Sequence, residues 1–191
     1  RLEPENNPHL LVEAWSRIPT ERTRGMALVV VGGAPYASDY ILRVKRTADP
    51  RVIFPGYVFG RGYWELQRNA YLFCASTEVG GTHPVILEAL VAGNCVLVND
   101  YEPNAETVGD AGVYFSGREG VHDLTRQVER LLDHPHEVQT YPKRALERAE
   151  QYSWDAVATA YEQLLLEVGE ETGHGPLPLD HHVSKLVSDR V

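Results

Sequence analysis

AYLFCASTEVGGTHPVILEALVAGNCVLVND, residues 70–100, consists of an apolar run, a loop with two glycines, a helical pattern and a second apolar run. The runs 70–76 and 95–100 have the length and composition of buried parallel strands. Pro84 is a residue that commonly opens a helix, and the pattern predicts one over 84–92. A strand, a helix and a strand in this order form the repeating unit of α/β folds.

The same alternation extends to both sides of this unit. Further strands are predicted at 26–33, 51–57 and 112–116, and further helices at 7–18, 38–47, 63–69 and 121–132. This order predicts an α/β fold with a Rossmann-like, doubly wound parallel sheet and helices on both faces.

After residue 135 the pattern is helical only. Pro142 opens one helix, and Ser153 caps another, with an apolar face of Trp154, Val157, Tyr161, Leu164 and Val168. We expect Trp15 and Trp154 to be core residues on helix faces. The predicted domain is 1–168, followed by a flexible tail or crossover arm at 169–191.

The first residues are unusual for such a fold. RLEPENN, residues 1–7, has the character of a loop, and Asn7 and Pro8 are suited to cap and open the first helix. In a doubly wound sheet the first strand is central. We therefore expect that the first strand is missing and that the chain is a fragment of a longer protein.

Bulk properties narrow the functional class. The 191 residues carry a net charge of −9, which argues against a general nucleic-acid surface. We find no signal peptide and no apolar run that could span a bilayer. Cys74 and Cys95 form no disulfide or metal pattern, which favours a reducing, cytoplasmic compartment. The His181–His182 pair lacks a third metal ligand at a suitable spacing.

The loop before helix 84–92 is a candidate anion site. Unpaired N–H groups at a helix N-terminus attract negative charge, and glycines allow a diphosphate to come close to the backbone. Glu88 lies one turn beyond Pro84 on the same face, where a carboxylate can accept hydrogen bonds from ribose hydroxyls. The spacing alone leaves a second interpretation equally open, namely a solvated glutamate after a plain turn.

Five segments together resemble one enzyme family. They are RLEPENN, VVVGGAP, RVIFPGYV, GGTHPVILEALVAG and NDYEPNAETVGDAGVYF. From Arg1 to about Tyr161, the chain resembles the C-terminal, donor-binding domain of a retaining family 4 glycosyltransferase of the GT-B type. The branch that it resembles most contains bacterial rhamnosyltransferases of surface-polysaccharide synthesis.

The resemblance implies roles for individual residues. Glu88 would hold the ribose hydroxyls and Arg1 the donor diphosphate. The residues of the phosphate and sugar loop would be Gly80, Gly81, Thr82 and His83, and those of the base loop Gly56, Tyr57 and Val58. No metal or other cofactor is implied, because helix N–H groups and Arg1 would stabilise the departing diphosphate.

The chain departs from the family pattern at two places. Asn6 takes the position of a lysine, and Gly80 takes that of the first glutamate. Glu78 lies two residues earlier and is the candidate replacement, so Glu78 and His83 are the candidate catalytic residues. Arg68 is a further candidate with either a packing or a functional role.

The expected partners are a nucleotide-sugar donor, a saccharide or lipid-linked acceptor, and an N-terminal half of the same protein that binds the acceptor, with peripheral association at the inner membrane face. The fragment alone should bind nucleotide weakly and transfer little sugar.

Alternatives are a sugar-nucleotide epimerase or phosphorylase of similar fold and a non-catalytic nucleotide-sugar-binding domain. VVGGAP is not the G-x-G-x-x-G of dinucleotide enzymes, which disfavours a dehydrogenase. Tyr63 and Trp64 are interpreted mainly as packing residues near the base loop.

Overall fold

The computed structural model describes residues 1–171. Contacts between residues divide the chain into a compact unit, Arg1–Gln151, and a second unit that begins at Tyr152. The domain limit expected from the sequence is residue 168. The His181–His182 pair and most of the predicted tail lie outside the described residues.

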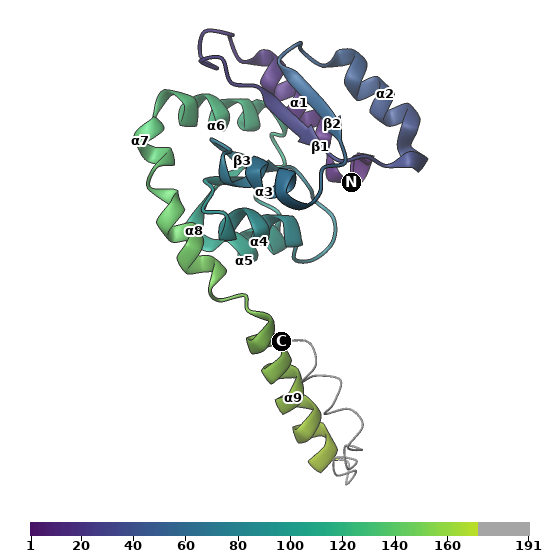
Figure 1. Ribbon diagram of the computed structural model, residues 1–191, viewed down its shortest axis with the longest axis vertical. Helices are drawn as coiled ribbons and strands as arrows, with labels where there is room; N and C mark the ends of the chain where they lie inside the picture. The colour runs from purple at the N-terminus through teal and green to yellow at the C-terminus, as the bar shows by residue number, and fades with distance from the viewer. Residues whose placement is uncertain (172–191) are drawn as a thin grey trace. The chain divides into compact units, whose positions relative to one another are not determined.

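The strands form inside the apolar runs that predicted them (Figure 1). Within residues 1–171 they are β1 (Leu28–Val31), β2 (Val52–Gly56), β3 (Phe73–Ala75), β4 (Val96–Asn99) and β5 (Gly112–Phe115). Every pairing between them is parallel. The predicted α/β fold with a parallel, Rossmann-like arrangement is therefore confirmed.

Helices alternate with these strands as predicted. In the described part of the chain they are α1 (Pro8–Arg17), α2 (Ser38–Thr47), α3 (Gly60–Arg68), α4 (Pro84–Val91), α5 (Glu102–Val108), α6 (Val121–Asp133), α7 (Pro135–Val138), α8 (Tyr141–Ala149) and α9 (Trp154–Glu171). Short 3-10 turns lie at η1 (Pro4–Asn6), η2 (Pro35–Ala37) and η3 (Gly109–Ala111).

The strands belong to two hydrogen-bonded sheets. One has the order β1-β2 and the other the order β3-β4-β5, with Leu28 opposite Val52 in the first and Val96 opposite Gly112 in the second. A doubly wound sheet of order 3-2-1-4-5-6 has its switch point beside the central strand. α/β proteins bind ligands at such a switch point, outside the carboxyl ends of the strands.

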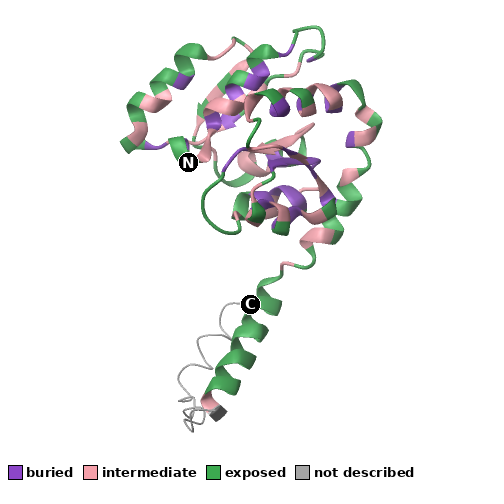
Figure 2. Cartoon of the chain, turned by 180° about the vertical axis from the view of Figure 1, so that it is seen from behind, coloured by how far each residue is buried: buried purple, intermediate pink, exposed green. Residues whose placement is uncertain are grey.

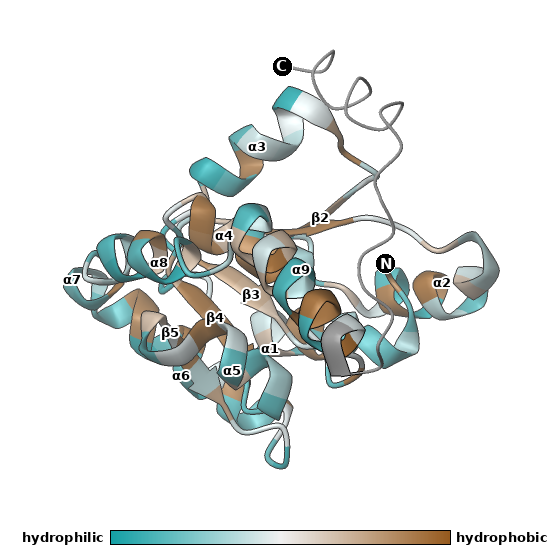
Figure 3. Cartoon of the chain, turned by 90° about the horizontal axis from the view of Figure 1, so that it is seen from below, coloured by the Kyte–Doolittle hydropathy of each residue, from teal (hydrophilic) through white to brown (hydrophobic). Residues whose placement is uncertain are grey.

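The core shows why helices lie on both faces. Along β4, Leu97 packs with residues of α1, β5 and α6, whereas Val96 and Val98 pack with residues of α4, α5 and α8. Alternate side chains of a strand point to opposite faces, so β4 is buried on both. Figure 2 shows the buried residues of the compact unit concentrated on its strands and on the helix faces beside them, and Figure 3 shows apolar strands among more polar helices.

Two expectations about individual residues were wrong. Asn7 precedes α1 in a left-handed conformation with φ of 52° and makes no side-chain capping bond; its amide donates to the carbonyl of Ser76 instead. Trp15 is a core residue, as predicted, but Trp154 is 86% exposed. The rest of the apolar face predicted for α9 is exposed too, although Ser153 does cap the helix by accepting from the Ala156 N–H.

Candidate functional site

The loop between β3 and α4 forms the candidate phosphate site at the carboxyl end of β3. Gly80 has φ of +96°, a conformation that favours glycine. The hydroxyl of Tyr101 donates to the carbonyl of Gly80 at 2.9 Å, which holds the loop. A Cβ on Gly81 would have no heavy atom of the described chain, beyond its own neighbours, within 4 Å. The loop backbone at Gly81 is therefore open to a ligand.

Helix α4 begins at this loop with its N-terminus exposed. His83 precedes the helix and Pro84 is its first residue, and His83 makes no side-chain capping bond. The imidazole lies over Gly80, with Cε1 3.6 Å from the place where a Cβ of Gly80 would be. Its Nε2 is buried without a hydrogen-bond partner among the described residues. First-turn amides and the helix dipole make this end of α4 attractive to an anion.

Glu88 lies one turn into α4 and is half-buried. Its Oε2 accepts a hydrogen bond from the hydroxyl of Tyr63 on α3, and Gln67 Nε2 donates to that hydroxyl at 3.0 Å. Burial, and next the bond to Glu88, raise the pKa of Tyr63 to about 12. The phenol therefore keeps its proton at neutral pH and presents it to Glu88.

Arg1 extends from the segment before η1. Its side chain is mostly exposed, with Nη1 at 3.3 Å from the hydroxyl of Tyr36 and 3.9 Å from Glu3 Oε2. The hydrogen bond with Tyr36 is the main reason why the pKa of Arg1 is raised. Tyr36 also donates to Glu3. Tyr36 and Glu3 together therefore orient the guanidinium, while most of it faces solvent.

Asn6, which the sequence resemblance places at the position of a lysine, makes hydrogen bonds within the chain. Its Nδ2 donates to the carbonyl of Arg1 at 3.0 Å and to Glu3 Oε1 at 3.2 Å, and its Oδ1 accepts from Thr77 Oγ1 at 3.0 Å. Ser76 Oγ adds a bond to the Asn6 carbonyl. Asn6 thus fastens the Arg1 segment to the carboxyl end of β3.

The candidate base loop follows β2. Gly56 has φ of +78°, and the hydroxyl of Tyr57 donates to the carbonyl of Gly33 at 2.8 Å. A Cβ on Gly33 would lie 3.0 Å from the Tyr57 ring, so the ring fits there because residue 33 is glycine. Tyr57 stacks on Phe59 with ring centroids 5.9 Å apart, and both rings are exposed, whereas Val58 is half-buried.

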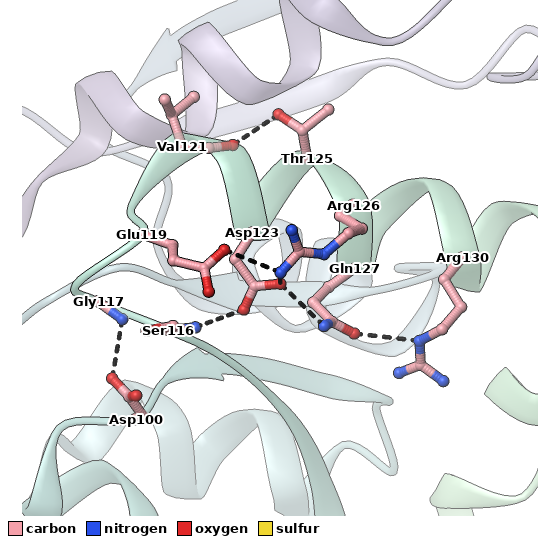
Figure 4. Close-up of polar contacts among 10 residues, drawn as sticks. All are labelled: Asp100, Ser116, Gly117, Glu119, Val121, Asp123, Thr125, Arg126, Gln127 and Arg130. Carbon is pink, nitrogen blue, oxygen red and sulfur yellow. Dashed lines mark hydrogen bonds and ion pairs between the residues drawn. The ribbon is translucent and has the colours of Figure 1, made fainter.

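Glu78 points to a different part of the molecule from His83. Its Oε1 is 3.0 Å from the place where a Cβ of Gly117 would be, near Asp100. Asp100 accepts from the N–H of Gly117 at 2.8 Å (Figure 4). The structure therefore brings His83 against Gly80 but places the Glu78 carboxylate beside the loops after β4 and β5.

The loop after β5 is held by a buried aspartate. Asp123 accepts from the N–H of Ser116 at 2.6 Å, from Arg126 at 2.7 Å and from Gln127 at 3.1 Å (Figure 4). Arg126 also binds Glu119 at 3.0 Å. These bonds join the end of β5 to the first turn of α6, which fixes the loop beside Glu78.

A comparison with protein families identifies the family of the chain. The family described as Glycosyl transferases group 1 matches residues 1–134, which is more than half of the chain. The chain belongs to this family. The matched residues include the Arg1 segment, the candidate base loop after β2, the loop between β3 and α4, and all of α4.

Solved glycosyltransferase structures have a similar fold. HepE of Anabaena in complex with UDP aligns with a TM-score of 0.75 and 18% identity over 86% of this chain and 46% of HepE. Sucrose-phosphate synthase from Thermosynechococcus elongatus aligns with a TM-score of 0.72 and 20% identity over 90% of this chain and 44% of the synthase. WaaG, a glycosyltransferase involved in lipopolysaccharide biosynthesis, aligns with a TM-score of 0.66 and 19% identity over 78% of this chain and 40% of WaaG.

This group 1 glycosyltransferase chain spans less than half of the length of each of those structures. No curated protein sequence matches it. Within residues 1–171, no helix has the length and apolarity to cross a membrane. In the same residues, no three His, Cys, Asp or Glu side chains are grouped in a way that could hold a metal ion.

Sequence reasoning missed part of the surroundings of Glu88. The sequence predicts a packing role for Tyr63 and does not single out Gln67 or Asn94, whose Nδ2 donates to Gln67 Oε1 at 3.2 Å. The spacing of Tyr63 and Gln67, four residues apart on one helix, is a local signal that they share a face. Arg68 lies with its guanidinium carbon 5.9 Å from the centroid of the Trp64 ring, a packing contact. The roles assigned to Arg1, Glu78, His83, Glu88, the phosphate loop and the base loop all stay predictions.

Proposed function

We propose that this group 1 glycosyltransferase chain is the donor-binding domain of an enzyme that transfers a sugar from a nucleotide diphosphate-sugar to a saccharide acceptor with retention. Following the resemblance of its sequence segments, we propose rhamnose as the sugar and surface-polysaccharide synthesis as the setting. Acceptor binding would belong to an N-terminal half of the same protein, at the cytoplasmic face of the membrane.

One observation carries the proposal. Glu88 lies one turn inside a helix whose N-terminus begins at an open, glycine-containing loop. A diphosphate at the loop amides would place the adjoining pentose near that carboxylate, which can accept from its hydroxyls. UDP in the HepE complexes is a ligand of this chemistry in a protein of similar fold.

The chemistry needed from this chain is electrostatic. When the bond between the anomeric carbon and the diphosphate oxygen breaks, negative charge grows on the diphosphate. The sugar carbon bonds to the acceptor oxygen, and the proton of that acceptor hydroxyl passes to the leaving diphosphate oxygen. The amides around Gly81 and the guanidinium of Arg1 would stabilise that charge. Donation of His83 Nε2 to a phosphate or sugar oxygen would satisfy a buried polar atom that has no partner among the described residues.

Isothermal titration of the chain with UDP, dTDP, GDP and ADP tests the proposal. We expect at least one of these nucleotides to bind, and Glu88→Gln to weaken its binding by about tenfold, the effect of one hydrogen bond to a charged group. Glu147→Gln is the matched control because Glu147 is exposed on α8 and pairs with Lys143. Binding of none of the four nucleotides would contradict the proposal.

A second measurement separates this function from its alternatives. The chain joined to its acceptor-binding half should convert donor to glycosylated product only when acceptor is present. An altered sugar nucleotide formed without acceptor would identify an epimerase instead. Nucleotide binding with no turnover in the complete protein would identify a non-catalytic binding domain.

A further inference from the structure

Glu88 is held by a side chain from another helix. The hydroxyl of Tyr63, on α3, donates to Oε2 of Glu88, on α4, although the two residues are 25 positions apart in the sequence. Both side chains are half-buried. A glutamate on a helix surface has several rotatable bonds, so a fixed donor on one oxygen selects one orientation of the carboxylate.

The hydroxyl of Tyr63 is itself held by a network of buried polar side chains. Gln67 Nε2 donates to Tyr63 Oη at 3.0 Å, and Gln67 Oε1 accepts from Asn94 Nδ2 at 3.2 Å. Gln67 is 6% exposed and Asn94 is 4% exposed. Asn94 follows α4 and is fixed by its backbone bond to the carbonyl of Ala89 at 3.0 Å.

The donor and acceptor roles in this series of hydrogen bonds determine which oxygen of Glu88 is free. Because the Tyr63 oxygen already accepts the N–H of Gln67, its own proton is directed to the Glu88 carboxylate. Oε2 is thereby occupied, and Oε1 is left to accept from a ligand, since an ionised carboxylate offers about four acceptor positions. Buried, satisfied polar chains of this kind rigidify the groups that they join.

We propose that Tyr63, supported by Gln67 and Asn94, is a positioning residue that orients Glu88 toward the pentose hydroxyls of a nucleoside diphosphate. This inference rests on the proposed nucleotide-binding function. The part of the ligand that depends on the contact between α3 and α4 would be the pentose hydroxyls. Tyr63 acts through Glu88 and does not itself need to touch the ligand.

The test compares UDP with 2′,3′-dideoxy-UDP, which lacks both hydroxyls. The unchanged chain should prefer UDP, and Tyr63→Phe, which removes only the hydroxyl, should weaken UDP binding by about tenfold while binding of the dideoxy analogue stays within about twofold. A role in packing alone would lower the affinity for both ligands equally. The readout is therefore the dissociation constant of the dideoxy analogue divided by that of UDP. Tyr63→Phe should lower this ratio.

Two further variants make the result interpretable. Tyr71→Phe is the matched control, because the hydroxyl of Tyr71 donates to the carbonyl of Leu131 at 2.7 Å, a contact with no link to Glu88; it should leave the ratio unchanged. Gln67→Met keeps the length of the side chain and removes the N–H, so it should lower the ratio in the same direction by a smaller factor.

The outcomes separate this inference from the function on which it rests. A ratio that is the same in Tyr63→Phe and in the unchanged chain overturns the positioning role. An unchanged chain that binds UDP but does not distinguish the two ligands also overturns it, because Glu88 then does not read the pentose hydroxyls. If no nucleoside diphosphate binds, the proposed function itself is wrong.

Discussion

Gly80 and Gly81 are neighbours in the candidate phosphate loop, but the backbone requires glycine only at the first. Gly80 has φ of +96°, where a side chain is strained, whereas Gly81 is outside this region and a Cβ there would meet open space. Stability therefore explains glycine at position 80. At position 81 the glycine is left to be explained by a ligand.

This difference predicts opposite phenotypes for two small substitutions. Gly80→Ala should lower the free energy of unfolding by about 1–2 kcal/mol, the cost of a left-handed backbone for alanine. Gly81→Ala should change it by less than about 0.5 kcal/mol, as surface substitutions usually do, yet weaken nucleotide binding, because in the proposed site the methyl group would occupy the space of a phosphate oxygen. Urea unfolding and titration with UDP measure the two effects. Unchanged UDP affinity in Gly81→Ala would show that phosphates do not approach there.

At the residue scale, the sequence predicted which residues gather near α4 better than how their side chains lie. Spacing placed Glu88 one turn beyond Pro84, and the helix beginning at Pro84 is confirmed. The donor from Tyr63 was not predicted, because a contact between residues of two helices leaves no periodic signal in the chain. The direction of Glu78 toward Gly117 depends on loops after β4 and β5 that the local sequence does not specify.

Among the elements, the junction between β5 and α6 depends on one carboxylate. Asp123 is 6% exposed, lies in the first turn of α6 and accepts three hydrogen bonds, one of them from the N–H of Ser116 (Figure 4). Burial alone would raise the pKa of Asp123. The bonds from Ser116, Gln127 and Arg126 outweigh burial, so its pKa lies below the usual value.

Replacing this aspartate should lower stability in a pH-dependent way. We expect Asp123→Asn to cost about 1–3 kcal/mol of unfolding free energy near neutral pH, because a charge-assisted acceptor is lost from a buried position. Since the folded-state pKa is depressed, the carboxylate contributes fully above the unfolded-state pKa of about 4, and its contribution is lost as the pH falls through the folded-state value. Urea unfolding at several pH values should show the two proteins converging in acid.

The control for this experiment is an aspartate in an equivalent position that is exposed. Asp39 lies in the first turn of α2 and is exposed. Asp39→Asn should change the unfolding free energy by less than about 1 kcal/mol. A loss as large as that of Asp123→Asn would show that the first-turn charge matters and that the buried bonds to the β5 loop do not.

Apolar patterns predicted the elements of the compact unit well, for a physical reason. A strand such as β4 is buried on both faces, so nearly every residue in it is apolar and the run is unambiguous. The same kind of pattern was misleading in α9, where Trp154 is exposed. Periodicity shows that a helix has an apolar face, but it does not show what, if anything, covers that face.

For the whole molecule, the division of contacts after Gln151 has a measurable consequence. A chain that ends at Gln151 should keep the urea midpoint and the UDP affinity of the full chain, because the hydrophobic clusters lie within this unit. It should also be more soluble, since the apolar residues of α9 are exposed. Circular dichroism, titration and sedimentation test this. Loss of the cooperative transition would show that the compact unit needs the segment after residue 151.

The two-part sheet of the described chain leaves β1 bonded to β2 alone and β3 bonded to β4 alone. β1 and β3 are therefore edge strands, each with a row of backbone amide and carbonyl groups that bond to no other strand of the described chain, and such edges can pair with an extended polypeptide. At high concentration that polypeptide will be a neighbouring molecule. Storage of the purified chain should consequently produce seeded, thioflavin-positive growth, which an extended apolar peptide that occupies the edges would suppress.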